Sequence, residues 1–351
     1  DRTNYWEVVP TNALDLALWM ESDRMGYLLP ALTPQKFETQ REVVLNERRQ
    51  SYENRPYGLA AMAIVAAMFP SNHPYHWMTI GEIADLNAAT FEDVSEFFRT
   101  YYHPSNASLV VAGDVDADDA LGRVRSHFEE IDPGPKPMPL QTSAELASER
   151  RLLLEDRVEL PRLYLAWLSP AMFTDGDAEM DLLSDLLANG KVSRLYRALV
   201  YERRIASEVM AFQNSRELGG FWQLVATSAP GHTLEELQSA IDTELAALLG
   251  SGPTPDEMER GHAQVEAQFV YRLQTLGGFG GKADQLNAYS VFLNDPGYFE
   301  RDLARYQGVT AADLHRVARK YLGTDNRVAL SVVPKGKLSL GLPHSTPAVV
   351  A

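Results

Sequence analysis

The spacing of polar and apolar residues predicts a long helix near the start of the chain. Thr33 is a suitable cap and Pro34 a suitable first helical residue, and neither glycine nor proline follows before Pro56. Residues three or four positions apart share one face of such a helix. One face therefore carries Phe37, Gln40, Val44, Glu47 and Ser51. This pattern predicts that Glu47 lies on the apolar side of the helix and that Arg48 points elsewhere.

Two distant segments follow the same pattern: a capped helix, a polar loop and an apolar run of strand length. They cover residues 90–113 and 310–334 and align without gaps. In both, threonine caps the helix and aspartate lies in its positively charged first turn. The matched pairs are Thr90 with Thr310 and Asp93 with Asp313. A chance match of two such units is the alternative, but the matched positions favour a duplication and hence two homologous domains.

The stretch between the two copies is rich in proline. Residues 132–141 (DPGPKPMPLQ) hold four prolines in ten residues, which neither a helix interior nor a central strand tolerates. We therefore predict a first domain over 1–131, a linker over 132–150 and a second domain over 151–340.

The offset between the copies also predicts a gap. The copies are 220 residues apart, and the second domain begins with a strand near Arg151. The counterpart of that strand would fall about 70 residues before Asp1. We therefore expect the first domain to lack about its first 70 residues, and we interpret residues 4–9 (NYWEVV) as one of its strands.

Composition limits the chemistry that the chain can perform. With no cysteine, any metal must be held by His, Asp or Glu. The net charge of −16 argues against binding to nucleic acid. Solubility is the simpler interpretation of this charge, and a preference for basic substrates is the alternative. No window approaches the ~18 uninterrupted apolar residues of a membrane span.

Glu47 is the carboxylate of most chemical interest in the predicted helix. A carboxylate on an apolar face needs a partner, because burial of an unpaired charge is costly. A salt bridge or a nearby backbone group would satisfy it, and so would a metal ion. Spacing alone does not choose between these possibilities.

The helix resembles a segment of the pitrilysin-type (insulinase) zinc peptidases. Residues 40–49 (QREVVLNERR), followed by SYENRPYG, are similar to the segment that supplies the third zinc ligand of that family. A polar residue precedes that ligand by seven positions, as Gln40 precedes Glu47. Four further segments are similar to the family: 1–25, 73–115, 190–202 and 320–334. The resemblance thus covers nearly the whole chain. Within the family, it extends to the bacterial zinc proteases that are similar to processing peptidases.

The resemblance implies an α+β fold of two homologous α/β-sandwich domains and a zinc site. The family motif H-x-x-E-H supplies two histidine ligands and a glutamate base, and a further glutamate completes the site. The resemblance assigns the metal-ligand role to Glu47 and places Gln40 beside the site as a hydrogen-bonding group. H-x-x-E-H is absent from this sequence, and the family spacing places it about 80 residues before Glu47, upstream of Asp1. We therefore expect no catalytic residue in this chain and weak or no zinc binding by it alone.

Histidines and glycines offer weaker candidate sites. His73 and His76 are three positions apart, but their polar, proline-containing surroundings favour a plain loop over a metal site. The glycine-rich residues 276–287 lack the spacing of a phosphate-binding loop, and no hydroxyl follows Lys282. A flexible connection to the next helix is the favoured interpretation.

A second departure from the family concerns substrate binding. The family has an Arg and a Tyr seven residues apart that orient the substrate, and Val200 and Ser207 hold those positions here. In two-protein members, one subunit carries the zinc motif and the other carries this pair. The resemblance thus implies the zinc-bearing half of a two-subunit endopeptidase that degrades peptides or unfolded segments in a closed chamber, or else a homodimer.

The alternative is a non-catalytic structural or partner-binding subunit of the same fold, such as the core components of respiratory complexes. The resemblance leaves the compartment open. Bacterial members often carry export signals, which favours the periplasm over the cytoplasm.

Overall fold

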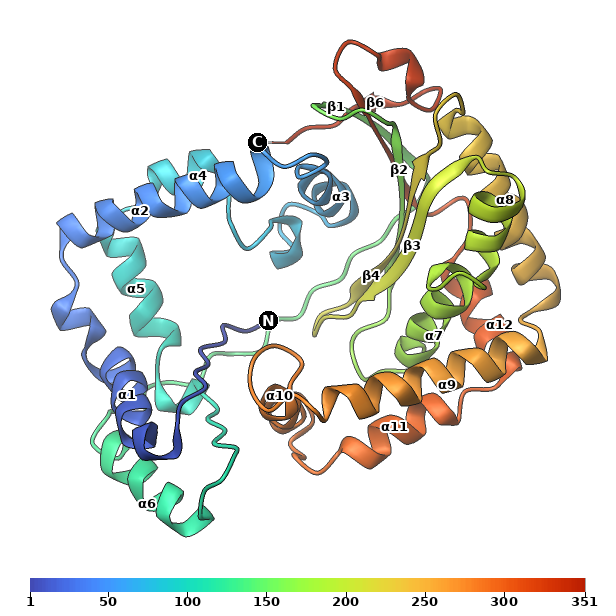
Figure 1. Cartoon of the computed structure of the whole chain (residues 1–351). Coiled ribbons are helices and arrows are strands. Elements are labelled where there is room, and N and C mark those ends of the chain that lie inside the picture. Colours follow the sequence, from blue (N-terminus) through green and yellow to red (C-terminus); the bar gives the residue numbers. More distant parts are fainter. Residues whose placement is uncertain (351) are drawn as a thin grey trace. The chain divides into compact units, whose positions relative to one another are not determined.

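The computed structural model describes residues 1–350, which form two compact units whose segments alternate along the chain (Figure 1). The first unit, called here the helical unit, comprises Asp1–Val44, Ala84–Leu140 and Glu266–Leu303. The second, the sheet unit, comprises Leu45–Ile83, Gln141–Val265 and Ala304–Ala351, of which we describe residues up to 350. The division between Leu140 and Gln141 falls inside the proline-rich stretch, where residues 132–149 form neither helix nor strand. The domain boundaries at 131 and 151 stay a prediction.

The sheet unit is built on six strands in the order β3-β4-β2-β5-β1-β6. They are β1 (Arg150–Asp156), β2 (Arg162–Ser169), β3 (Ala206–Asn214), β4 (Gly220–Ser228), β5 (Val328–Pro334) and β6 (Thr346–Pro347). β1 pairs in parallel with β5 and β6, and the other pairs are antiparallel. The predicted α+β class is confirmed, and the strands predicted near Arg151 and at the end of the second copy are present.

Helices cover both faces of this sheet. On one face, α3 (Ala60–Met68) packs with Ile64 and Met68 against Tyr164 of β2 and Leu330 of β5. On the other lie α7 (Asp177–Ala188), α8 (Leu234–Ser251) and α12 (Ala311–Tyr321) (Figure 1). Trp167 and Trp222 are fully buried on this second face, and the Trp222 indole donates a hydrogen bond to Met180 O of α7 at 3.1 Å. A π-helical segment (Tyr196–Glu202) precedes β3.

The helical unit contains no strand within its described residues. Its elements are α1 (Leu14–Ala31), most of α2 (Pro34–Arg48), α4 (Ile83–Ala88), α5 (Phe91–Tyr101), α6 (Ala117–Phe128), the end of α9 (Pro255–Arg272), α10 (Lys282–Leu293) and the start of α11 (Phe299–Gln307), with short 3-10 turns at Thr11–Ala13 and Pro104–Asn106. The strands predicted at residues 4–9 and after α5 are therefore wrong for this structure. A strand forms only where a neighbouring strand takes up its backbone hydrogen bonds, and none does so here.

The helix starts follow the sequence prediction closely. The Lys36 amide donates to Thr33 Oγ1 at 3.3 Å at the start of α2. Both helices of the repeat, α5 and α12, have 11 residues and a reciprocal capping box. Within residues 1–350, no helix has both the length and the apolar character that crossing a membrane requires.

Candidate functional site

Glu47 lies in the last turn of α2, and its side chain is exposed. The buried side of this turn instead carries Leu45 and Arg48, which are 6% and 2% exposed. The prediction that Glu47 lies on the inner face and Arg48 points elsewhere is therefore wrong. Helical spacing defines which residues share a face, but packing of Leu45 and Arg48 in the sheet unit decides which face is inside.

Arg48 is buried because its charge has partners close by. Its Nε lies 3.1 Å from Glu53 Oε1, and its Nη1 donates to the carbonyl oxygen of Gly81. Glu53 ends a π-helical turn, Arg49–Glu53, that continues directly from α2. Paired in this way, a guanidinium is tolerated in the interior. The sequence offered one signal for this role: Arg48 follows the apolar Leu45 by three positions.

Glu47 has a carboxylate without a hydrogen bond or ion pair among residues 1–350, so it is open to an external ligand. Gln40, on the same helix, is exposed. Across the same residues, no three His, Asp or Glu side chains lie close enough together to hold a metal ion. The donor set therefore does not fit zinc by itself, although Glu47 fits the role of one ligand among several. Both assignments, metal ligand for Glu47 and hydrogen-bonding neighbour for Gln40, stay predictions.

The two histidines of the NHPYHW segment make contacts of a structural kind. His73 is fully buried between the rings of Phe69 and Tyr75, at centroid distances of 4.8 and 5.0 Å. Its Nδ1 accepts from the Tyr75 amide at 3.0 Å, and burial lowers its pKa. His76 Nδ1 lies 2.7 Å from the Phe69 carbonyl oxygen, to which it donates. The connection thus contains a 3-10 turn, Pro74–His76, capped by His73.

The two positions of the family's substrate-orienting pair are occupied by other residues here, Val200 and Ser207. Val200 is half-buried in the π-helical segment, and Ser207 lies exposed on β3. The Ser207 hydroxyl donates to the Thr227 carbonyl oxygen of β4 at 3.3 Å. Neither side chain supplies a cation or a phenol.

The glycine-rich loop leads into α10, as predicted, and one carboxylate holds it in place. Asp284 accepts hydrogen bonds from the Gly280 amide and the Asn4 side chain, both at 2.9 Å. Trp6 also packs close to Gly278. All these residues belong to the helical unit.

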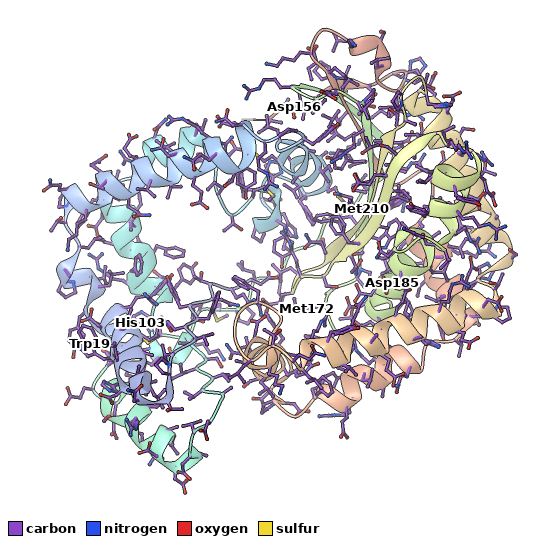
Figure 2. The ribbon with its side chains drawn as sticks, viewed as in Figure 1. Trp19, His103, Asp156, Met172, Asp185 and Met210 are labelled. Carbon is purple, nitrogen blue, oxygen red and sulfur yellow. The ribbon has the colours of Figure 1, made fainter. Side chains whose placement is uncertain are left out.

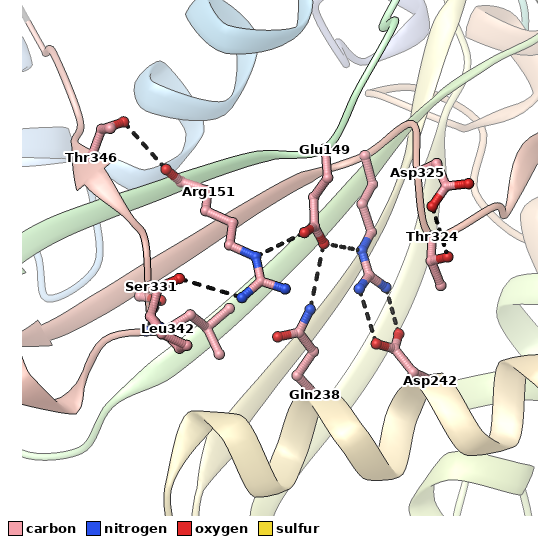
Figure 3. Close-up of polar contacts among 11 residues, drawn as sticks. Glu149, Arg151, Gln238, Asp242, Thr324, Asp325, Ser331, Leu342 and Thr346 are labelled. Carbon is pink, nitrogen blue, oxygen red and sulfur yellow. Dashed lines mark hydrogen bonds and ion pairs between the residues drawn. The ribbon is translucent and has the colours of Figure 1, made fainter.

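A buried arginine that the sequence did not single out, Arg327, pairs with two acids, Glu149 and Asp242, which Figure 3 labels. Arg327, 1% exposed, donates to Glu149 at 2.8 Å and to Asp242 of α8 at 2.5 and 3.0 Å. Glu149 also accepts from Arg151 Nε at 2.7 Å. These bonds tie the end of the proline-rich stretch to α8 and β5. A shallow groove of about 540 Å³ lies beside them, lined by Arg151, Glu235, Gln238, Ser239, Asp242, Thr243, Ala246 and Pro343.

Comparison with known proteins shows that this chain is similar to a peptidase M16 domain family and to proteins named zinc proteases. The family model described as the peptidase M16 inactive domain matches residues 88–265. Zinc protease PqqE of Helicobacter pylori is 28% identical over 325 residues, which are 92% of this chain and 72% of the relative. Uncharacterized zinc protease SCO5738 of Streptomyces coelicolor is 26% identical over 263 residues. That match covers 72% of this chain but only 55% of the relative. The crystal structure of a protease from Helicobacter pylori superposes with a TM-score of 0.82 at 26% identity, covering 93% of this chain and 78% of that one.

Proposed function

The chain belongs to the peptidase M16 (pitrilysin/insulinase-type) family, and from that premise we propose that the intact protein is the zinc-bearing subunit of an endopeptidase. It degrades peptides or unfolded segments inside a closed chamber. One observation carries the proposal: Glu47, which the sequence resemblance assigns as the third zinc ligand, presents an exposed carboxylate that is free of partners among residues 1–350. The likeness to a protein named a zinc protease over 92% of this chain supports it.

The zinc site proposed for the intact protein combines Glu47 with residues outside this chain. An H-x-x-E-H motif upstream of Asp1 would supply two histidine ligands and the general base. Bound zinc would lower the pKa of a coordinated water and so generate the nucleophile. Gln40, seven residues before Glu47, would donate or accept a hydrogen bond near the site. On its own, the chain of residues 1–351 is expected to bind zinc weakly and to hydrolyse nothing.

The subunit also needs a partner for substrate binding. Val200 and Ser207 cannot replace an arginine and a tyrosine in holding a peptide backbone. We therefore propose a homologous mate that supplies the pair, with a homodimer as the second arrangement. Full peptidase activity from the purified single subunit would contradict the heterodimer.

A second function, a non-catalytic structural or partner-binding subunit, is favoured by one specific finding. The inactive-domain model covers residues 88–265 and does not include Glu47. In this case Glu47 would be an ordinary surface carboxylate.

The deciding experiment uses the full-length protein with its upstream residues. Zinc content is measured by atomic spectroscopy, and cleavage of an unfolded fluorogenic protein is measured with and without the candidate partner. We expect about one zinc per subunit, lost in Glu47→Gln but retained in Glu42→Gln, an exposed glutamate of the same helix. A metal-free, inactive full-length protein would establish the non-catalytic function instead.

A further inference from the structure

Arg216 lies in the turn between β3 and β4 and has no acid partner. Its Nε donates to Asn214 Oδ1 at 3.0 Å. Its guanidinium carbon lies 4.9 Å from the centre of the Tyr75 ring and 5.9 Å from that of the Phe221 ring, both within the range of a cation–π contact. Within the part of the chain that the structure describes, no carboxylate forms an ion pair with Arg216 and no acceptor binds its two Nη atoms.

The half-buried guanidinium of Arg216 is therefore a desolvated cation without a counter-charge. Burial lowers the pKa of Arg216, because it excludes water that would stabilise the charge. Burial opposes the charge of Arg327 as well, but hydrogen bonds with Asp242 and Glu149 outweigh it and raise the pKa of Arg327. Arg216 keeps the cost of desolvation, and an anion bound to its Nη atoms would offset that cost.

An acid that binds the same turn, Asp177, is already paired with other groups. Its Oδ1 accepts from the Ser215 hydroxyl, and its Oδ2 accepts from the Phe173 amide at 2.8 Å. Arg305 Nη1 lies 3.4 Å from the same Oδ2. Asp177 thus pairs with Arg305 and holds the base of the turn, and it leaves Arg216 without an anion.

The position of Arg216 is fixed by contacts that need no ligand. The amide of Met172, which Figure 2 labels, donates to the Arg216 carbonyl oxygen at 3.0 Å. The Leu218 amide donates to the Tyr75 hydroxyl at 3.1 Å, and Tyr75 is 5% exposed. A group that is held in place before binding loses little conformational freedom when a ligand arrives, which favours affinity.

Two apolar side chains adjoin this turn on one face of the sheet. Met210 and Phe212 alternate with Asn214 along β3, so the three share a face. Phe221 lies on that face too, because it is the cross-strand partner of Asn214. Met210, labelled in Figure 2, is 36% exposed and Phe212 is 39% exposed. An exposed apolar strip, Met210 and Phe212, therefore leads along β3 to a cation at the end of the sheet.

We propose that Arg216, Phe212 and Met210 bind the C-terminal end of a peptide. The two Nη atoms donate parallel hydrogen bonds to the two oxygens of the terminal carboxylate, whose single charge balances the guanidinium. The apolar strip contacts the side chains that precede the terminus. Because the strip ends at the turn, a chain end fits this site better than an acidic side chain in the middle of a peptide. Binding needs neither zinc nor Glu47, so the inference goes beyond the proposed function and applies to a peptidase and to a non-catalytic subunit alike.

The test measures binding of a peptide by fluorescence anisotropy, with the full-length protein in excess EDTA so that no zinc-dependent cleavage occurs. The probe is a short peptide of alanine and leucine, labelled with fluorescein at its N-terminus and ending in either a free carboxylate or an amide. We expect the free acid to bind about tenfold more tightly than the amide. Arg216→Gln should abolish this preference, and Arg216→Lys should restore part of it. Phe212→Ala should weaken both peptides alike, about threefold.

Arg319→Gln is the matched control, and circular dichroism checks the folding of each variant. Arg319 is an exposed arginine of α12, which covers the other face of the sheet, so this variant loses the same charge away from the site. It should keep the preference of the parent for the free acid.

Three outcomes would overturn the inference. The first is equal binding of the free acid and the amide by the parent. The second is an unchanged preference in folded Arg216→Gln, or an equal loss of preference in Arg319→Gln, which would assign the effect to net charge. The third is an amidated peptide with an internal glutamate that binds as tightly as the free acid, which would assign the site to acidic side chains. Should Arg216→Gln not fold, Arg216→Met takes its place. Because zinc is absent throughout, failure of the proposed zinc site leaves each of these results unchanged.

Discussion

The helices α5 and α12 have the same length and the same cap but very different surroundings. In α12, Leu314, Val317 and Ala318 are at most 1% exposed and pack where α12 meets α7, α8 and β2. At the corresponding positions of α5, 220 residues earlier, Val94 and Phe98 are half-buried and Phe97 is 50% exposed. A strand, β5, follows α12, whereas the equivalent apolar run after α5 forms none. Caps are therefore set by a few neighbouring residues, while burial and strand formation depend on a sheet supplied by distant parts of the chain.

The largest expected effect comes from placing a charge on each helix at the matched position. Val317→Asp buries an unpaired carboxylate and should lower the free energy of unfolding by about 4 kcal/mol. Phe97→Asp changes a half-exposed position and should cost no more than about 1 kcal/mol. Urea titration followed by far-UV circular dichroism measures both. Equal losses would contradict the contrast between the two helices, because they would mean that the face of α5 is covered in solution.

The next effect concerns the residue that precedes the apolar run in each copy. Arg327 occupies this position before β5, and its counterpart in the first copy is Ala107. Arg327→Ala leaves Glu149 and Asp242 without their buried partner. Those acids keep side-chain exposures of 21% and 29%, so we expect a loss near the lower end for buried pairs, about 3 kcal/mol.

Ala107→Arg serves as the control for that substitution, since Ala107 is exposed and an arginine at this position can extend into solvent. Its effect should stay within about 0.5 kcal/mol by the same urea titration. A loss of similar size in both variants would show that the position, rather than the ion pairs, sets the stability.

Local signals allowed much of the fold to be predicted from sequence. The helix caps at Thr33, Thr90 and Thr310 depend only on residues close by in the sequence, and the structure confirms them. The family resemblance was read from short sequence segments, and the comparisons confirm it. The strand at residues 4–9 failed because a strand needs a partner that no local pattern guarantees. In the candidate site, Glu47 was identified through the resemblance. The hydrogen bond from the Tyr57 amide to the Asp156 carboxylate could not be predicted, because it joins residues 99 positions apart in the sequence.

The two capping boxes should respond alike to removal of their threonines. Thr90→Ala and Thr310→Ala each delete the two hydrogen bonds of the threonine hydroxyl, one from the aspartate amide and one to its carboxylate, and should each cost about 1 kcal/mol. Amide hydrogen exchange at Asp93 and Asp313 reports the two helix starts separately, since these amides donate to the threonine hydroxyls at 3.1 and 3.2 Å. A much larger effect at Thr310 would mean that its cap also supports the packed face of α12, a role that the cap of α5 does not have.

The smallest expected effect is a pH dependence shared by both boxes. Hydrogen bonds from Thr90 lower the pKa of Asp93, and hydrogen bonds from Thr310 lower that of Asp313. Because the folded pKa is below the unfolded value of about 3.9, the stabilisation is complete above that pH. It is lost as the pH falls through the folded pKa.

NMR titration of the two carboxyl groups should give similarly low pKa values, and Thr90→Ala should return the pKa of Asp93 alone toward its ordinary range. Arg316 makes a small further contribution at Asp313, so Arg316→Ala should raise that pKa slightly and leave Asp93 unchanged. If Asp93 titrated normally while Asp313 stayed low, the cap would depend on tertiary packing, and the local origin assigned to it here would be wrong.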